Sequence, residues 1–123
     1  MVKRRIKQET AILLKTINNA ILEKKGEELL NLNLTEIENT VAEYFIICHA
    51  NSSTQVNAIA NSIEEMVKKN TGEKPWKKEG YSNSEWVLLD YVNVVVHVFQ
   101  TQSREFYKLE KLWADAETTL IID

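Results

Sequence analysis

The chain has 123 residues, of which 44% are hydrophobic and 27% are charged, and its formal net charge is −3 at pH 7. These values predict one soluble globular domain, large enough to bury a single core. The single cysteine, Cys48, excludes an internal disulfide. No apolar run approaches the ~18 residues of a membrane span. The basic N-terminus also lacks the apolar core of a signal peptide, so we expect a cytoplasmic protein.

Charge and aromatic residues are unevenly distributed along the chain. Residues 1–78 contain 12 basic and 10 acidic side chains, whereas residues 79–123 contain 3 basic and 8 acidic ones and seven of the ten aromatic residues. An acidic segment gains little free energy by releasing the counterions of a nucleic acid. A basic protein surface is therefore the better partner for the aromatic-rich part.

The first 50 residues predict one helix and two strands. Apolar residues recur at helical spacing between Lys7 and Lys25, and Gly26 is a suitable stop. The apolar residues of this helix are Ile6, Leu13, Leu14, Ile17, Ala20 and Ile21. Leu29–Leu34 partly alternates between apolar and polar residues, which indicates a short strand. Tyr44–Ala50 is almost continuously apolar, the pattern of a strand buried on both faces.

Residues 51–70 predict the most regular helix of the chain, because apolar side chains recur every three or four positions. They are Val56, Ile59, Ala60, Ile63, Met66 and Val67. Ser52 followed by Gln55 has the form of a capping box. Trp76–Gly80 then predicts a short strand at a sheet edge, where its lysines would prevent unwanted pairing.

Trp86–Gln100 predicts two strands joined by a two-residue turn, at Tyr91-Val92 or at Val92-Asn93. Either turn sorts the side chains into the same two faces. The first face is a core face with Val87, Leu89, Tyr91, Val94, Val96 and Val98. The second face carries Trp86, Leu88, Asp90, Val95, His97 and Phe99.

The C-terminal segment predicts a helix over residues 101–113, with Thr101 or Ser103 as its N-cap. Its apolar face would carry Phe106, Leu109 and Trp113. Residues after Asp115 are expected to form a loosely ordered tail. The whole chain is thus predicted to be one α/β domain over residues 1–123, with a mixed sheet, flanking helices and the order α-β-β-α-β-β-β-α.

Asp90 and His97 are the one acid and the one histidine of the predicted hairpin, and two roles are open for them. In the first, the last helix covers their face, Asp90 belongs to the turn, and His97 is hydrogen-bonded to the backbone. In the second, these side chains and their aromatic neighbours form a partly exposed patch that anchors a partner.

Catalysis and metal binding have less support in the sequence. Asp90 and His97 have the chemistry of a base and its orienting partner, but no nucleophile accompanies them, and Cys48 lies on a separate predicted strand. Cys48, His49 and His97 lack the HxxxH or CxxC spacing of metal ligands. The three glycines form no phosphate-binding loop. We therefore expect no catalytic residue, no metal and no cofactor.

Three longer segments carry a family resemblance. They are "AEYFIICHANSSTQVNAIANSIEE" (Ala42–Glu65), "EGYSNSEWVLLDYVNVVVHVFQ" (Glu79–Gln100) and "REFYKLEKLW" (Arg104–Trp113). With the leading helix these segments cover nearly the whole chain. They resemble the ribosomal silencing factor family, whose members are also called Iojap-related proteins.

The resemblance implies a translational repressor that is not an enzyme. It implies a nucleotidyltransferase-like fold and binding to the large ribosomal subunit through its protein number fourteen, so that the small subunit cannot join. It also implies action when nutrients are scarce or during subunit maturation, and a homodimer when the protein is free. Contact with ribosomal RNA is expected to be peripheral at most, and no membrane is involved.

The alternative function is a nucleotidyltransferase-like enzyme acting on nucleotides or transfer RNA. Metal-dependent nucleotidyl transfer needs paired carboxylates one residue apart on a strand, usually preceded by a Gly-Ser pair. Here Asp90 is followed two positions later by Val92, and "HANSSTQ" contains no Gly-Ser pair. The sequence therefore favours a fold that lacks this chemistry.

The hairpin turn departs from the family pattern. The family usually has Asp-Tyr-Gly-Asp, whereas this chain reads Asp90-Tyr91-Val92-Asn93. A β-branched residue disfavours positive φ, so we expect Asn93 to take any left-handed position.

Strand parity and the resemblance together predict a docking face in place of a catalytic centre. Trp86 would be the apolar anchor and Asp90 the charge partner for a basic ribosomal protein. Arg104 and Tyr107, near the start of the last helix, would flank the patch. The full predicted partner-binding set is Trp86, Leu88, Asp90, His97, Phe99, Arg104 and Tyr107.

Overall fold

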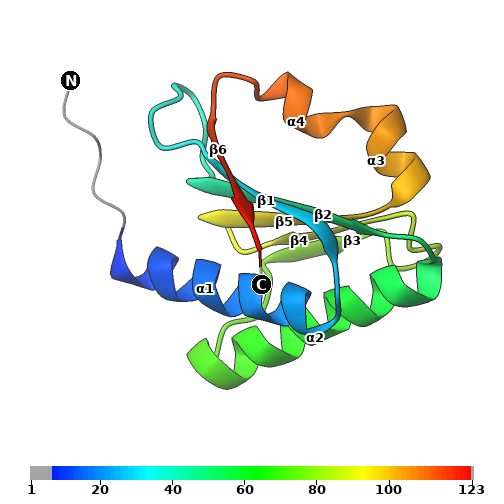
Figure 1. Cartoon of the computed structure of the whole chain (residues 1–123). Helices are drawn as coiled ribbons and strands as arrows, with labels where there is room; N and C mark the ends of the chain where they lie inside the picture. Colours follow the sequence, from blue (N-terminus) through cyan, green and yellow to red (C-terminus); the bar gives the residue numbers. More distant parts are fainter. Residues whose placement is uncertain (1–6, 123) are drawn as a thin grey trace.

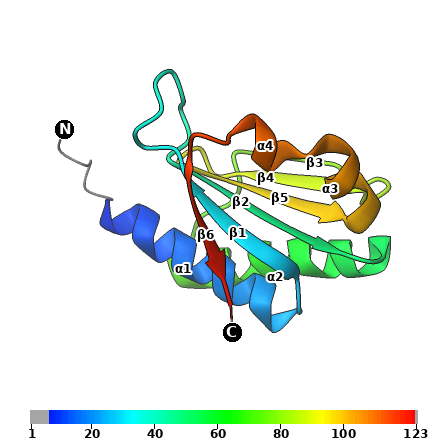
Figure 2. The same ribbon diagram turned by 45° about the horizontal axis from the view of Figure 1, so that its top comes forward.

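A six-stranded sheet with helices on both faces organises residues 7–122, the part of the chain that this computed structural model describes (Figure 1). The elements in chain order are α1 (Gln8–Glu23), β1 (Glu27–Asn33), β2 (Tyr44–Ala50), α2 (Ser53–Thr71), β3 (Lys77–Glu79), β4 (Trp86–Asp90), β5 (Val94–Gln100), α3 (Thr101–Tyr107), α4 (Leu109–Leu112) and β6 (Glu117–Ile121). The strand order is β3-β4-β5-β2-β1-β6 (Figure 2). Only β2 and β5 pair in parallel, and the other neighbours are antiparallel. The predicted mixed sheet with flanking helices is confirmed.

The main core lies between the sheet and the helices α1 and α2, which run side by side beneath it (Figure 1). The predicted core face of the β4–β5 hairpin points into this core and is buried throughout. Its residues are Val87, Leu89, Tyr91, Val94, Val96 and Val98. Ile6, predicted on the apolar face of the first helix, lies outside the described residues.

Helix α2 begins with half of the predicted capping box. The Ser52 hydroxyl accepts a hydrogen bond from the backbone N–H of Gln55 at 3.1 Å, which satisfies one free donor of the first turn. The Gln55 side chain instead donates to the carbonyl of Lys24 at 3.2 Å. This bond ties the start of α2 to the end of α1.

The C-terminal segment differs from the predicted single helix. Lys108 adopts a left-handed conformation (φ 49°, ψ 49°), which divides the segment into α3 and α4. The N-cap residue is Gln100, whose side chain does not cap the helix, and the Thr101 hydroxyl donates to the Asn51 side chain at 2.7 Å. Phe106 is 78% exposed, so it does not share a buried face with Leu109 and Trp113. The break bends the chain so that α3 and α4 arch over the sheet (Figure 1).

The predicted loosely ordered tail from residue 115 is wrong over most of its length. Residues Glu117–Ile121 form β6, which pairs antiparallel with β1 from Asn33–Glu117 to Leu29–Ile121. Without β6, the backbone donors and acceptors on the outer side of β1 would lack partners. A short run of threonines and apolar residues, with no turn signal around it, gave no sign of this pairing.

The β4–β5 register, with Asp90 opposite Val95, is the one expected for a turn at Val92-Asn93, but the positive φ falls on the residue that we did not expect. Val92 has φ 75°, and the N–H of Asn93 donates to the carbonyl of Tyr91 at 3.0 Å. These features describe a three-residue γ-turn, a conformation that is strained for side chains other than glycine. The N–H of Val92 donates to Asp90 Oδ1 at 2.7 Å, and this bond supports the turn.

No helix within residues 7–122 has both the length and the apolar character needed to cross a membrane.

Candidate partner-binding site

Strand pairing builds one continuous surface on the side of the sheet away from α1 and α2. Lys77 pairs with Asp90, Asp90 with Val95, and Val95 with Phe45. Because paired residues of neighbouring strands point to the same face, these side chains lie in one row across β3, β4, β5 and β2. Leu88 pairs with His97 in the adjacent row. Asp90 and His97 therefore share a face, as predicted.

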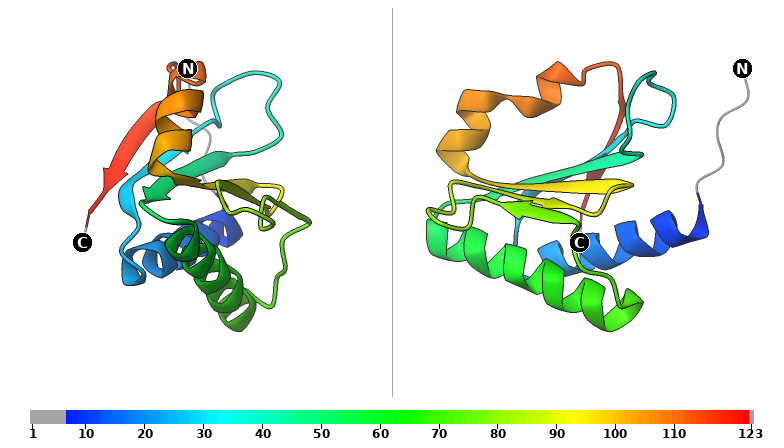
Figure 3. Two further views of the ribbon diagram at one scale, coloured as in Figure 1. Left: turned by 90° about the vertical axis from the view of Figure 1, so that its right-hand side faces the viewer. Right: turned by 180° about the vertical axis from the view of Figure 1, so that it is seen from behind.

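Helices α3 and α4 cover only part of this face. Helix α3 packs on β5 and β2, whereas β4 and β3 extend beyond it (Figure 3, left). Beneath the helices, the Trp86 ring lies 4.7 Å from Phe99 and 4.8 Å from Tyr107. Phe45 meets Trp113 edge-on at 5.4 Å. The covered part is thus a second, aromatic core.

His97 is a buried member of this aromatic core. Its Nδ1 accepts a hydrogen bond from the Trp86 indole N–H at 3.1 Å, which places the ring proton on Nε2 in the neutral form. Burial lowers the pKa of His97 to about 4, because a charged imidazolium loses its hydration there. Within residues 7–122, Nε2 has no hydrogen-bond partner. His97 bonds to a side chain and not to the backbone, so that detail of the first predicted role is wrong.

Arg104 is also buried and joins three elements of the fold. Its Nε donates to Glu110 at 3.1 Å, and its Nη1 donates to the carbonyl of Glu28 at 2.8 Å and contacts His49 Nδ1 at 2.9 Å. Glu28 lies at an irregularity of β1 with φ 44°. Arg104 therefore fastens α3 to β1 and β2, and it is not a free cation beside the hairpin.

The seven predicted partner-binding residues consequently divide into two groups. Trp86, Leu88 and Asp90 are partly exposed, and Tyr107 is 50% exposed. The others, His97, Phe99 and Arg104, are at most 5% exposed. Buried side chains cannot form a docking surface, so the prediction is wrong for these three. His97 and Phe99 lie against Trp86, and Arg104 holds α3 to β1 and β2.

The uncovered part of the sheet, which we name the open face, is formed by Val41, Ala42, Trp76, Leu88, Asp90, Val92 and Val95. Six of these residues, all except Leu88, line a shallow groove of about 470 Å³. Trp76 is 76% exposed and Val41 is 83% exposed. Exposed apolar side chains gathered around one acid form the kind of patch that binds other proteins.

Sequence reasoning missed Trp76. The backbone N–H of Trp76 donates to the carbonyl of Asp90 at 2.7 Å, and this bond fixes the tryptophan beside the hairpin. The sequence alone shows a tryptophan before an edge strand but not the pairing partner of that strand. The available signal was a large apolar residue followed directly by two lysines, because such a residue is not expected to be buried in the core.

Asp90 has one structural bond and a charge that remains available. One carboxylate oxygen accepts the turn bond from Val92 at 2.7 Å. The Asp90 carboxylate makes no other hydrogen bond or ion pair within residues 7–122, and the pairing neighbour Lys77 contacts Glu79 at 3.3 Å. The carboxylate can therefore meet a cation supplied by a partner.

The cysteine and histidines of the hypothetical metal site do not converge. Cys48 packs in the core beside α1 and α2, whereas the adjacent His49 points to the opposite face of the sheet and contacts Arg104. Burial raises the pKa of the Cys48 thiol to about 12, so it is not a thiolate near neutral pH. Among the described residues, no three His, Cys, Asp or Glu side chains are placed to hold a metal ion.

The fold and the open face define a class: a small mixed α/β protein that presents an apolar, acidic sheet surface beside a buried aromatic core. The chain belongs to the family described as "Ribosomal silencing factor during starvation", whose model matches residues 7–123.

Three relatives show how this similarity is distributed. The ribosomal silencing factor RsfS of Bacillus subtilis is 45% identical over 104 residues, which span 85% of this chain and 86% of that protein. A crystal structure of a Bacillus halodurans protein has a TM-score of 0.78 and 39% identity, and the match covers 90% of this chain and 99% of the other. The mouse protein "mitochondrial assembly of ribosomal large subunit protein 1" is 31% identical over 78 residues, which are 62% of this chain and 34% of that protein.

Proposed function

We propose that this protein silences translation by binding the large ribosomal subunit through its protein number fourteen, which prevents the small subunit from joining. The open face is the contact surface. The observation that carries the proposal is that the open face, on the side of the sheet away from α1 and α2, bears exposed apolar side chains that α3 and α4 leave uncovered. The names of the relatives, a ribosomal silencing factor and a factor for assembly of the large ribosomal subunit, support the choice of partner.

The chemistry of the open face favours a basic protein partner. Trp76 and Leu88 offer apolar area, and Asp90 offers one charge that the fold does not neutralise. Protein interfaces concentrate their free energy in a few central anchors surrounded by polar residues. A basic side chain of the partner beside Asp90 would set the orientation, while the apolar anchors supply most of the affinity.

Sedimentation with purified subunits tests the proposal. In the first assay, the protein is mixed with large subunits and centrifuged through a sucrose gradient. In a second assay, light scattering of the two subunits mixed with the protein records whether the small subunits still join the large ones. We expect the protein to travel with the large subunits and the joining signal to fall. A protein that stays at the top of the gradient would refute the proposed function.

Two variants of Asp90 separate charge from turn geometry. Asp90→Asn retains an oxygen that can accept the N–H of Val92, whereas Asp90→Ala removes it. If Asp90 meets a cation of the partner, both variants bind subunits more weakly and Asp90→Asn retains the stability of the wild type. Equal binding by Asp90→Asn and the wild type would remove Asp90 from the interface.

Self-association through the same face is a second part of the proposal. An exposed apolar groove in a free protein is stabilised if another copy covers it. Light scattering at concentrations of about tens of micromolar, suited to weak dimers, should give a mass above that of the 14.2 kDa monomer. Added large subunits should dissociate the dimer. A monomer at all concentrations would contradict the proposed self-association.

A further inference from the structure

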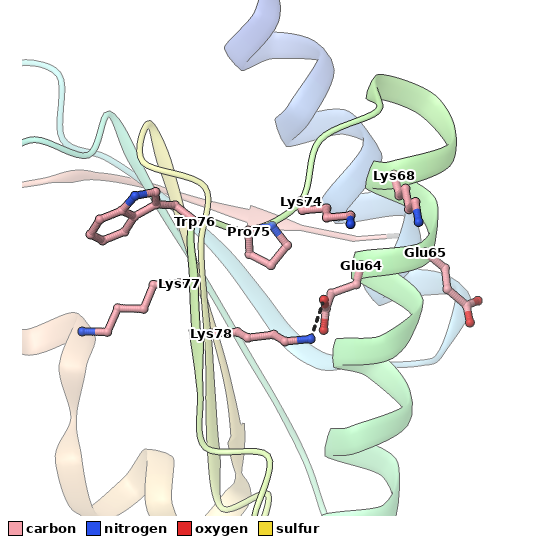
Figure 4. Close-up of a pocket in the computed structure, with 8 residues that line it drawn as sticks. All are labelled: Glu64, Glu65, Lys68, Lys74, Pro75, Trp76, Lys77 and Lys78. Atoms are coloured by element: carbon pink, nitrogen blue, oxygen red, sulfur yellow. Dashed lines mark hydrogen bonds and ion pairs between the residues drawn. The ribbon is translucent and has the colours of Figure 1, made fainter.

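A lysine-rich groove lies on the other side of the edge strand β3 from the open face. Figure 4 shows Lys74 and Lys78 on the side of β3 that faces α2, with Lys68 and Glu64 on that helix, whereas Trp76 and Lys77 point to the opposite side of the strand. The groove has a volume of about 510 Å³ and is lined by Glu64, Glu65, Lys68, Lys74, Pro75, Trp76, Lys77 and Lys78.

The charge of this region is opposite in sign to that of the whole chain. The residues that line the groove include four lysines and two acids, Glu64 and Glu65, a balance of +2, although the protein carries a net charge of −3. All four lysines are exposed. Lys68 and Lys74 have no acidic partner within 4 Å among residues 7–122, and Lys78 has one, Glu64, at 3.3 Å. The Lys78 side chain is exposed, and Glu64 also accepts a hydrogen bond from the Tyr81 hydroxyl, so Lys78 can exchange Glu64 for another anion at little cost in stability.

We propose that this groove binds the phosphate backbone of RNA, as a second contact beside the open face. This inference rests on the proposed function, because a protein seated on a ribosomal subunit meets RNA around the bound ribosomal protein. Lysine ammonium groups contact phosphates as point charges, and the groove offers three of them on one side of an edge strand. The lysines also keep β3 from pairing with another strand, which leaves this edge free for RNA.

The groove and the open face suit different partners. The open face has Asp90 as its one charged side chain, which disfavours phosphate, whereas the groove is lined by four lysines and two glutamates. Strand β3 separates the two surfaces, with Lys77 on one side and Lys78 on the other. One molecule can therefore contact a basic protein and an adjacent RNA at the same time.

The test compares two triple variants that carry the same net charge. Lys68→Gln, Lys74→Gln and Lys78→Gln together form the groove variant. Lys15→Gln, Lys24→Gln and Lys111→Gln together form the control, since these lysines are exposed and lie elsewhere on the molecule. Fluorescence anisotropy measures binding of the full chain and both variants to a short fluorescein-labelled RNA hairpin at several salt concentrations.

We expect the wild type and the control variant to bind the hairpin, and the groove variant to bind at least about tenfold more weakly at low salt. Each phosphate contact contributes about 0.9 to the slope of log affinity against log salt, so the groove variant should lose about 2 to 3 from that slope. Equal binding by the two variants, or no binding by the wild type, would overturn the inference. So would displacement of the RNA by polyglutamate at equal charge concentration, which would identify an acidic peptide site.

Sedimentation with large subunits keeps this inference distinct from the proposed function. If the wild type travels with subunits but does not bind RNA, the RNA inference fails and the proposed function stands. If the wild type does not travel with subunits, the proposed function fails whatever the hairpin shows. If the groove variant binds subunits more weakly than the control variant, both are supported.

Discussion

The γ-turn at Val92 leads to a prediction about the sign of a substitution. An L-residue in a left-handed conformation costs about 1–2 kcal/mol, and Val92 has φ 75°. Glycine has no such cost, but it increases the conformational entropy of the unfolded chain, which lowers the stability by about 0.4–1 kcal/mol relative to alanine. The balance makes Val92→Gly about 1 kcal/mol more stable than Val92→Ala. Both variants remove the same half-exposed apolar contacts, so these cancel in the comparison.

Val95 provides the matched control for this prediction. It lies on β5, three residues further along the same hairpin, and it is likewise partly exposed. In extended backbone glycine is the less stable residue, by about 0.5–1 kcal/mol relative to alanine. We therefore expect Val95→Gly to be less stable than Val95→Ala, with the opposite sign to position 92.

Urea unfolding followed by circular dichroism measures all four variants. The expected difference at position 92 corresponds to about 4 °C in the melting temperature for a domain of this size. If glycine is less stable than alanine at both positions, Val92 is not held at positive φ in solution, and the assigned turn is incorrect.

Three further changes are predicted. Trp86→Ala should lower the free energy of unfolding by about 2 kcal/mol, since a half-buried ring and the bond to His97 are lost. It should also weaken subunit binding at least tenfold, because the partly exposed ring borders the open face beside Leu88 and is predicted to anchor the partner; a folded variant that binds normally would make Trp86 purely structural. Gly80→Ala should unfold or strongly destabilise the chain, because Gly80 has φ 91° and a Cβ there would overlap the carbonyl oxygen of Trp86; wild-type stability in urea would contradict this close approach. Stability should fall by about 3 kcal/mol between pH 6.5 and pH 4, because the unfolded state protonates His97 in a range where burial keeps it neutral. The lowered pKa of His49 acts in the same direction, so His97→Asn should remove only part of this pH dependence, and an unchanged pH dependence in that variant would show that His97 is not the group responsible.

Local patterns predicted the regular elements because one buried face determines each of them. The spacing of Val56, Ile59 and Ile63 requires a helix, and strand parity placed Asp90 and His97 on one face. The resemblance to the silencing factors was specific because it rests on three long segments, the hairpin and the two segments that flank it. The nucleotidyltransferase likeness of the fold and the homodimer stay predictions.

Long-range packing decided what the sequence could not. Whether His97 and Phe99 are exposed depends on where α3 and α4 lie, and that position depends on the left-handed residue Lys108 and on the bonds of Arg104. Lysine and arginine give no local signal for either role. Strand β6 likewise could not be predicted from its own residues, because it forms by pairing with the free edge of β1.

A pair of glutamate substitutions tests docking through the open face most directly. Leu88 lies on the open face, and Ile12 is a partly exposed apolar residue of α1 on the opposite side of the molecule. Co-sedimentation with large subunits should show that Leu88→Glu lowers the affinity at least tenfold, the scale expected for a central anchor, whereas Ile12→Glu binds like the wild type. Equal binding by the two folded variants, or a loss confined to Ile12→Glu, would contradict binding through the open face.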